Sequence, residues 1–367
     1  MKTYTLPQAL YLYVFVLLGL SSCKEDSPPP IERPIPTVIL SEVPYNTLSA
    51  YGLFDEDSLS NMYPNARVFP YTLNTALFTD YAYKSRFIYL PEETSIVYRS
   101  LEALDFPVGT ILVKNFYYYQ DERRPDLGKQ LIETRLLVHK ENGWEAYPYK
   151  WNSTQTDADY WPEGKRLDAS WIDQAGSLQT ISYQIPKRSE CQNCHTLSNS
   201  MSPIGPSSRN LNMDYSDGGE TYNQLTKMET MGWLSNLPPI ESIEKAANWE
   251  DTTQSLEARA RAYLDINCGH CHRPNGPAHD SGLFLYHQEN DRYNLGICQV
   301  SIPAVSGSGG YLYDIVRGNP ESSFLVHRME SNDEALKMPE IGRSVVHKEG
   351  VALIAEWIRS MKPNDCP

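Results

Sequence analysis

The first half of the chain carries the two-residue alternation of apolar and polar positions that is typical of β-strands. Between residues 37 and 186, runs rich in β-branched and aromatic residues, such as Phe106–Tyr119, are separated by turn residues. Two such runs flank Asn142-Gly143, a dipeptide that favours a tight hairpin. Helical periodicity is almost absent here. The pattern predicts a β-sandwich-like N-terminal domain.

From Lys187 onward the pattern changes to short helices joined by loops rich in Gly, Pro and Asn. Apolar residues recur at helical spacing in 220–236, 251–272 and 349–362. Thr252 or Thr253 is expected to cap the second of these helices. We therefore expect a multidomain α+β protein, in which the β-rich domain (37–186) precedes two small, mostly α-helical segments, 187–250 and 251–367.

The beginning of the chain predicts export. Residues 1–22 combine Lys2 with an apolar run that is short for a membrane span, as in a signal peptide. The following Leu20-Ser-Ser-Cys23 resembles a bacterial lipobox, so Cys23 is the expected lipid anchor and 23–36 a proline-rich tether. An ordinary signal peptide that leaves Cys23 free is the alternative. We expect an outer-membrane lipoprotein of the cell envelope, on the periplasmic or the cell-surface side.

Composition and net charge limit the kinds of molecule that the protein is expected to bind. The 367 residues are 41% hydrophobic, long enough for two or three domains, and carry 32 basic against 46 acidic residues, a net charge of −14. This acidic balance argues against a nucleic-acid ligand and would favour a basic protein partner.

Two short motifs carry the candidate chemistry. The pattern Cys-x-x-Cys-His occurs as Cys191, Cys194, His195 and again as Cys268, Cys271, His272. This spacing is the attachment signature of c-type haem: the cysteines form thioethers with the porphyrin vinyl groups, and the adjacent histidine binds iron. A zinc knuckle would need a fourth ligand, and a redox dithiol would not require the histidine. Two copies predict two covalently attached haem c groups, with His195 and His272 as proximal iron ligands.

The remaining cysteines, Cys298 and Cys366, are expected to form a disulfide in an exported protein. Two unrelated buried thiols are the alternative, since sequence alone cannot establish a bridge.

The sequence indicates the sixth iron ligand more clearly for the second haem than for the first. A helix that enters the second motif and a C-terminal helix that crosses it are typical of a cytochrome c-like domain, where a methionine on a loop completes the iron. Met338, which precedes Pro339 ahead of the last helix, is the predicted ligand, with Met329 as the runner-up. The first haem has no comparable loop. The candidate ligands of the first iron are Met213, Met228, Met231 or a residue of another domain, whereas Met201 is too close to the motif. The alternative is an open coordination site. Arg209 is a candidate partner for the haem propionates.

The order of these parts resembles a family of bacterial diheme c-type cytochrome lipoproteins. The resemblance rests on the lipobox, on "PYTLNTALFTDYAYKSRFIYLP" and "FPVGTILVKNFYYY" in the β-rich domain, on "CQNCH" with "PIGPSSRNLN", and on "NCGHCHRPNGPAHDSGL" with "MPEIGR". It implies haem attachment at both motifs and supports Met338. It does not supply the first distal ligand or the redox partner.

The leading hypothesis is an electron carrier, in which two haems accept electrons from one redox partner protein and pass them on. The alternative is a diheme peroxidase or oxidase with one open haem site. Its weakness is that Cys191 and Cys268 are only 77 positions apart, which is short for two full peroxidase domains. A third hypothesis has the β-rich domain bind a carbohydrate or protein and exchange electrons with it through the haems. The sequence of the β-rich domain contains no nucleophile elbow, no phosphate loop and no metal-type histidine cluster.

Overall fold

The computed structural model describes Met1 and residues 33–217, 219–301, 310–363 and 366. The described residues of Pro34–Pro367 form one compact unit. Within the described residues, no helix is long and apolar enough to cross a membrane.

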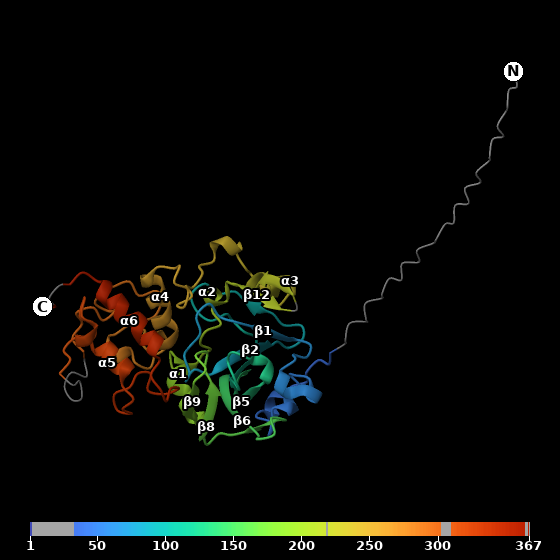
Figure 1. Cartoon of the computed structure of the whole chain (residues 1–367). Helices are drawn as coiled ribbons and strands as arrows, with labels where there is room; N and C mark the ends of the chain where they lie inside the picture. The colour runs from blue at the N-terminus through green and yellow to red at the C-terminus, as the bar shows by residue number, and fades with distance from the viewer. Residues whose placement is uncertain (2–32, 218, 302–309, 364–365, 367) are drawn as a thin grey trace. The chain divides into compact units, whose positions relative to one another are not determined.

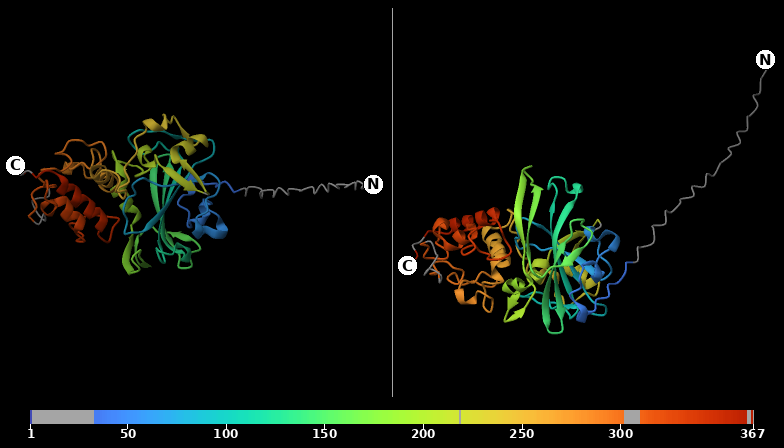
Figure 2. Two further views of the ribbon diagram at one scale, coloured as in Figure 1. Left: turned by 45° about the horizontal axis from the view of Figure 1, so that its top comes forward. Right: turned by 90° about the horizontal axis from the view of Figure 1, so that it is seen from below.

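A six-stranded antiparallel sheet is the largest element. Its strands, in spatial order, are β1 (Val68–Tyr71), β2 (Tyr83–Tyr89), β4 (Ile111–Tyr119), β5 (Lys129–Lys140), β6 (Gly143–Trp151) and β7 (Ala158–Tyr160). Figure 2 shows these strands side by side as one twisted layer. In the β5–β6 pair, Lys140 lies opposite Gly143. The hairpin predicted at Asn142-Gly143 is therefore confirmed.

The other strands form two-stranded pairs. They are β8 (Lys165–Ile172) with β9 (Leu178–Ile185), β10 (Thr196–Leu197) with β11 (Ser200–Met201), β12 (Asp214–Asp217) with β13 (Glu220–Asn223), and, in parallel, β3 (Ile96–Val97) with β14 (Leu234–Ser235). Four of the helices are short: α1 (Cys191–His195), α2 (Ser208–Leu211), α3 (Gln224–Thr230) and α5 (Phe324–Glu330). The two longer ones are α4 (Leu256–Leu264) and α6 (Lys348–Ser360).

The sheet has a different cover on each face. On one face, Val113 and Leu136 pack against the 43–62 segment. On the other face, Leu112 and its neighbours pack against α2 and α3, whereas Phe116 and its neighbours pack against the β8–β9 hairpin. The strands before residue 186 and helices α2 and α3, which follow the first motif, therefore share one hydrophobic core.

The helices α4, α5 and α6 make a core of their own. Tyr263, Leu325, Ile354 and Trp357 are buried together in it. Figure 1 shows these three helices grouped together, apart from strands β1–β9. The predicted 349–362 helix corresponds to α6, while the helix expected from 251 begins at Leu256, with Ser255 as its cap instead of Thr252 or Thr253.

The predicted fold class is wrong. The protein is strand-rich, with one six-stranded antiparallel sheet, several small sheets and only 24% helix, and it lacks two mostly α-helical cytochrome c-like domains. After the first motif the chain forms hairpins, because Ser198 and Asn199 adopt positive φ and turn it back within a few residues. A second large sheet that would complete a β-sandwich is also absent from the described residues, since the strands that pack on the large sheet there, such as β8–β9 and β3–β14, form only two-stranded pairs.

A buried ion pair stabilises the face that turns toward the first motif. The Glu133 side chain is fully buried on β5, and it accepts hydrogen bonds from Arg135 Nη2 at 2.5 Å, Arg135 Nε at 3.0 Å and the Tyr183 hydroxyl at 2.6 Å. Replacing Glu133 with Gln leaves the largely buried Arg135 guanidinium without its counter-charge. We expect a loss of about 3–5 kcal/mol in the free energy of unfolding, measured by urea denaturation.

An exposed pair supplies the matched control. Arg124 and Asp126 also make a bidentate contact, but both side chains are more than half exposed. Asp126→Asn should change the free energy of unfolding by less than about 1 kcal/mol. If the two substitutions cost the same, the Glu133 carboxylate is not held in a low-dielectric site.

Candidate functional site

The first motif lies on helix α1, directly after strand β9 and one short 3-10 turn (Arg188–Glu190). Glu190 accepts a hydrogen bond from the Lys187 backbone at 2.7 Å, which fixes the entry to the helix. At the other end, the His195 ring nitrogen Nδ1 lies 2.9 Å from the Ser202 carbonyl oxygen, across the β10–β11 hairpin. The hairpin that follows the motif therefore orients its histidine.

The second motif lies at the end of α4. The helix starts at the Ser255 cap and runs into one π-helical turn, Asp265–Gly269, a distortion often found at functional sites. Gly269 has to be glycine, because a Cβ there would lie 2.7 Å from the Tyr286 Cα. The Asn267 side chain accepts from the Phe78 backbone amide at 2.8 Å, so the turn is tied to the chain before strand β2.

The two motif histidines, His195 and His272, have the same tautomer and the same charge. His272 Nδ1 lies 3.3 Å from the Leu283 carbonyl oxygen, and His195 Nδ1 lies 2.9 Å from the Ser202 carbonyl oxygen. A carbonyl oxygen only accepts, so each Nδ1 carries the proton. Burial lowers the pKa of each ring to about 4, which keeps both rings neutral at pH 7. Each Nε2 therefore keeps a free lone pair, as a metal-ligating histidine requires.

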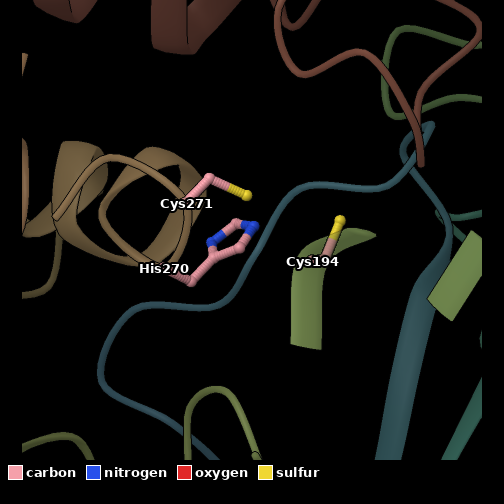
Figure 3. A group of neighbouring side chains, drawn as sticks. All are labelled: Cys194, His270 and Cys271. Atoms are coloured by element: carbon pink, nitrogen blue, oxygen red, sulfur yellow. The ribbon is translucent and has the colours of Figure 1, made fainter. Parts of the chain in front are cut away.

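The two motifs, far apart in the sequence, meet in space. One ligand atom from each of Cys194, His270 and Cys271 lies within 4.8 Å of the other two (Figure 3). The Cys271 thiol also lies 3.6 Å from the Asn193 carbonyl oxygen. The hydrogen bond from Cys271, together with His270 beside it, lowers the pKa of Cys194 despite its burial. The second cysteine of each motif thus faces the other motif.

A cavity of about 160 Å³ separates the first motif from the large sheet. Cys191, Cys194 and His195 line it on one side. The sheet lines it with side chains of strands β1, β2, β4 and β5, namely Tyr71, Arg86, Lys114 and Arg135.

The second motif has a larger cavity, of about 460 Å³. Cys268, Cys271 and His272 line it together with Met329 and Met338. The predicted sixth ligand and its runner-up thus both lie at the cavity that contains His272. Met338 is held by its backbone: its amide donates to the Arg328 carbonyl at 3.0 Å, and its carbonyl accepts from Arg343 Nε at 3.0 Å.

The methionines considered for the first haem lie elsewhere. Met201, Met213, Met228 and Met231 line neither cavity described above. Met228 is fully buried in the core beneath α3, and Met231 is 43% exposed. Arg209 is paired with Asp265 at 2.6 Å and with Glu244 at 3.6 Å, so its charge is already balanced.

Sequence reasoning missed the sheet residues Arg86, Lys114 and Arg135. Each is a single basic residue among mostly apolar and aromatic neighbours in its strand, and β2 and β5 contain other lysines, so the signal in the sequence is weak. They come together only through strand register, which the sequence does not reveal.

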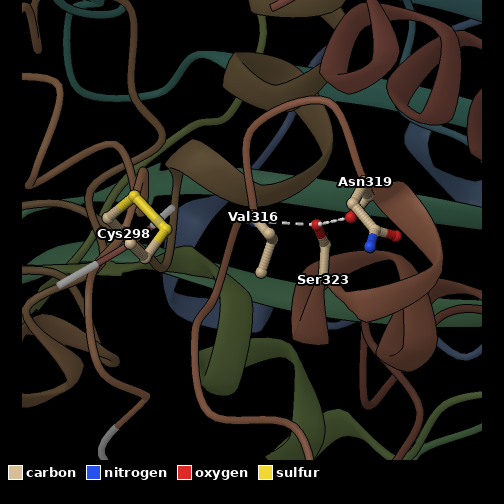
Figure 4. The surroundings of a disulfide bond; sticks show 5 residues. Cys298, Val316, Asn319 and Ser323 are labelled. Carbon is tan, nitrogen blue, oxygen red and sulfur yellow. Dashed lines mark hydrogen bonds between the residues drawn. A yellow bond between two sulfur atoms is a disulfide. The ribbon is translucent and has the colours of Figure 1, made fainter. Parts of the chain in front are cut away.

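The other two predictions about cysteines are the disulfide between Cys298 and Cys366 and the lipid anchor at Cys23. A disulfide joins Cys298 to Cys366. It lies near the turn in which Ser323 Oγ donates to the Asn319 carbonyl at 2.8 Å and accepts from the Val316 amide at 2.9 Å (Figure 4). Cys23, the predicted lipid anchor, lies outside the described residues.

No family model, no curated protein and no solved structure matches this chain.

Proposed function

We propose that the protein is a diheme c-type cytochrome that transfers electrons between redox partner proteins. One observation carries the proposal: the two Cys-x-x-Cys-His motifs meet at Cys194 and Cys271, and both histidines keep Nε2 free. A redox dithiol or an isolated zinc knuckle does not explain two neutral histidines, each oriented by a backbone carbonyl.

The chemistry of the motif cysteines and of the neighbouring cavities fits covalent attachment of haem. Four cysteines are free thiols, available for two thioethers at each motif: Cys191, Cys194, Cys268 and Cys271. Each motif borders a cavity, and the surface of each cavity is mainly apolar. When bound, each haem supplies a one-electron couple between ferric and ferrous iron. Because Cys194 and Cys271 lie close together, the two motifs would hold the two groups near each other, which would favour electron transfer between them.

Spectroelectrochemistry of the full chain, produced in a host with c-type haem maturation, tests the proposal. We expect a haem spectrum and two reversible one-electron steps. Absence of covalent haem from the fully matured chain would contradict it.

Met338 makes a specific prediction about the second haem. Thioether ligation raises the potential of the iron, so Met338→His should lower the potential of the second haem by roughly 0.1–0.3 V, part of the ~0.8 V range that axial ligands span. The first haem should keep its potential. The control is Met329→Leu, at the same cavity. A potential that falls only in the Met329 variant would assign the ligand to Met329.

A diheme enzyme is the second candidate, and the first motif favours it. None of the four methionines considered for the first iron lines its cavity, where the methionines present are Met329 and Met338. If both of these serve the second haem, whose cavity they also line, the first iron keeps an open coordination position. Carbon monoxide added to the reduced protein distinguishes the two functions. Binding to one haem, together with turnover of hydrogen peroxide, would support the enzyme, and no binding supports the carrier.

A structural metal site is the third candidate. Cys194, His270 and Cys271 could hold a metal ion such as zinc, with a fourth ligand from solvent. Metal analysis of the protein purified after haem maturation separates the cases, because thioether formation at Cys194 and Cys271 removes two of the three ligands.

We also propose that lipid at Cys23 anchors the protein in the cell envelope, on the strength of the lipobox sequence. The acidic net charge of −14 favours a redox partner with a basic docking face. Cys23→Ala should move the protein from the membrane fraction to the soluble fraction.

A further inference from the structure

Three cations lie in one row across the large sheet. Strand register places Arg86 of β2 opposite Lys114 of β4, and Lys114 opposite Arg135 of β5. Tyr71 of β1 continues the row beyond Arg86. Like charges directly opposite one another destabilise a sheet, so this row needs a source of negative charge.

The chain balances only one of the three cations. Arg135 is paired with Glu133 at 2.5 Å. Among the described residues, Arg86 has no ion pair and its Nη2 has no hydrogen-bond partner, although the residue is only 7% exposed. Lys114 also makes no ion pair with a described residue, and its ammonium lies 5.0 Å from the centre of the Phe116 ring. Two basic side chains, Arg86 and Lys114, are therefore left without an anionic partner among the described residues.

Burial makes this arrangement costly. The pKa of Lys114 is held well below its usual value, mainly by burial and to a smaller extent by the positive charges of Arg86 and Lys84. Burial also lowers the pKa of Arg86. An unpaired buried cation costs several kcal/mol of stability, whereas one that meets an anion does not carry this cost. Both side chains line the cavity that also contains Cys191, Cys194 and His195.

The other arginines near this motif have partners already. Arg343, at the same cavity, donates to the carbonyl oxygens of Ser331 at 2.7 Å and Met338 at 3.0 Å. Arg209, at a neighbouring cavity, is paired with Asp265. Arg86 and Lys114 are the cations of this wall that are still available to a bound anion.

Resting on the proposed function, we propose that Arg86 and Lys114 bind the two propionate carboxylates of the first haem. The row lies between the two apolar clusters that cover this face of the sheet, and it faces the first motif across the cavity. Two carboxylates would balance the two unpaired cations. The six-stranded sheet is then one wall of the haem pocket, which gives the β-rich region a role in setting the potential of the first haem.

The test is the reduction potential of the first haem in the full diheme chain. A cation beside a propionate stabilises the reduced iron, so Arg86→Gln and Lys114→Gln should each lower this potential, and the double variant should lower it further. The second haem should not change. Variants that retain only one motif assign the two redox steps. The resonance Raman bands of the propionates should shift in the same variants.

Conservative and remote substitutions provide controls. Arg86→Lys and Lys114→Arg keep the charge and should retain most of the wild-type potential, even if a glutamine variant folds poorly. Lys165→Gln removes an equal charge from an exposed position on β8 and should have no effect. Unchanged potentials and propionate bands in both glutamine variants would overturn the assignment.

Two further outcomes separate the possible failures. If the wild-type chain carries no haem at the first motif, the proposed function fails, and this assignment fails with it. A different result would overturn only the propionate assignment. In that case two haems are present, added acetate or phosphate shifts the potential of the wild-type protein, and the glutamine variants lose this shift. The row of cations then binds an external anion.

Discussion

Replacing Cys191 and Cys194 together with alanine is expected to reduce covalently bound haem from two groups per chain to one. Each thioether bond needs a cysteine sulfur, and Cys191 and Cys194 are the only cysteines of the first motif. The second motif should keep its haem, because it belongs to the separate core of α4, α5 and α6. The pyridine haemochrome absorbance per mole of protein measures the ratio.

The matched variant replaces Cys268 and Cys271 with alanine and should also retain one haem. Ser189→Ala, at an exposed position beside the first motif, should retain two. A haem content that stays at two in the Cys191 and Cys194 variant would show that the first motif does not carry the cofactor.

The second large effect is expected in the chain without haem. When Cys191 and Cys268 are replaced by serine, oxidation with a diazene such as diamide should join Cys194 to Cys271. The two thiols lose two electrons and two protons to the diazene, which becomes a hydrazine. Their sulfur atoms lie within 4.8 Å of each other, and the lowered pKa of Cys194 supplies the thiolate. Non-reducing electrophoresis and peptide mapping measure the bond.

A comparison pair tests the geometry. With Cys194 and Cys268 replaced instead, Cys191 and Cys271 are left, and Cys191 is outside the close group. This pair should cross-link much more slowly. The wild-type chain loaded with haem should not cross-link, because its thiols are consumed. Equal rates for the two pairs would contradict the close approach of Cys194 and Cys271.

The features that the sequence predicted correctly are local ones. Asn142-Gly143 specifies its hairpin because only a few residues with unusual backbone angles can make such a turn. The 349–362 helix was also recognised, since a long amphipathic period is a strong signal.

The features that were missed depend on contacts between distant segments. The 220–236 segment was expected to be one helix, but Glu220–Asn223 pairs with β12 and only Gln224–Thr230 is helical. Met228 and Leu225 are buried against the sheet, so their helical spacing reflected packing on the β-rich region. The row formed by Arg86, Lys114 and Arg135 needed the register of three strands. Tertiary contacts, not local propensity, placed the site.

The measurement that tests the central claim most directly is the intact mass of the matured full chain, followed by mapping of its haem peptides. The account predicts the mass of the chain plus two haems, with one haem peptide that contains Cys191 and Cys194 and another that contains Cys268 and Cys271. A mass without haem, with four alkylatable thiols and a bound zinc ion, would contradict the account and assign Cys194, His270 and Cys271 to a metal site.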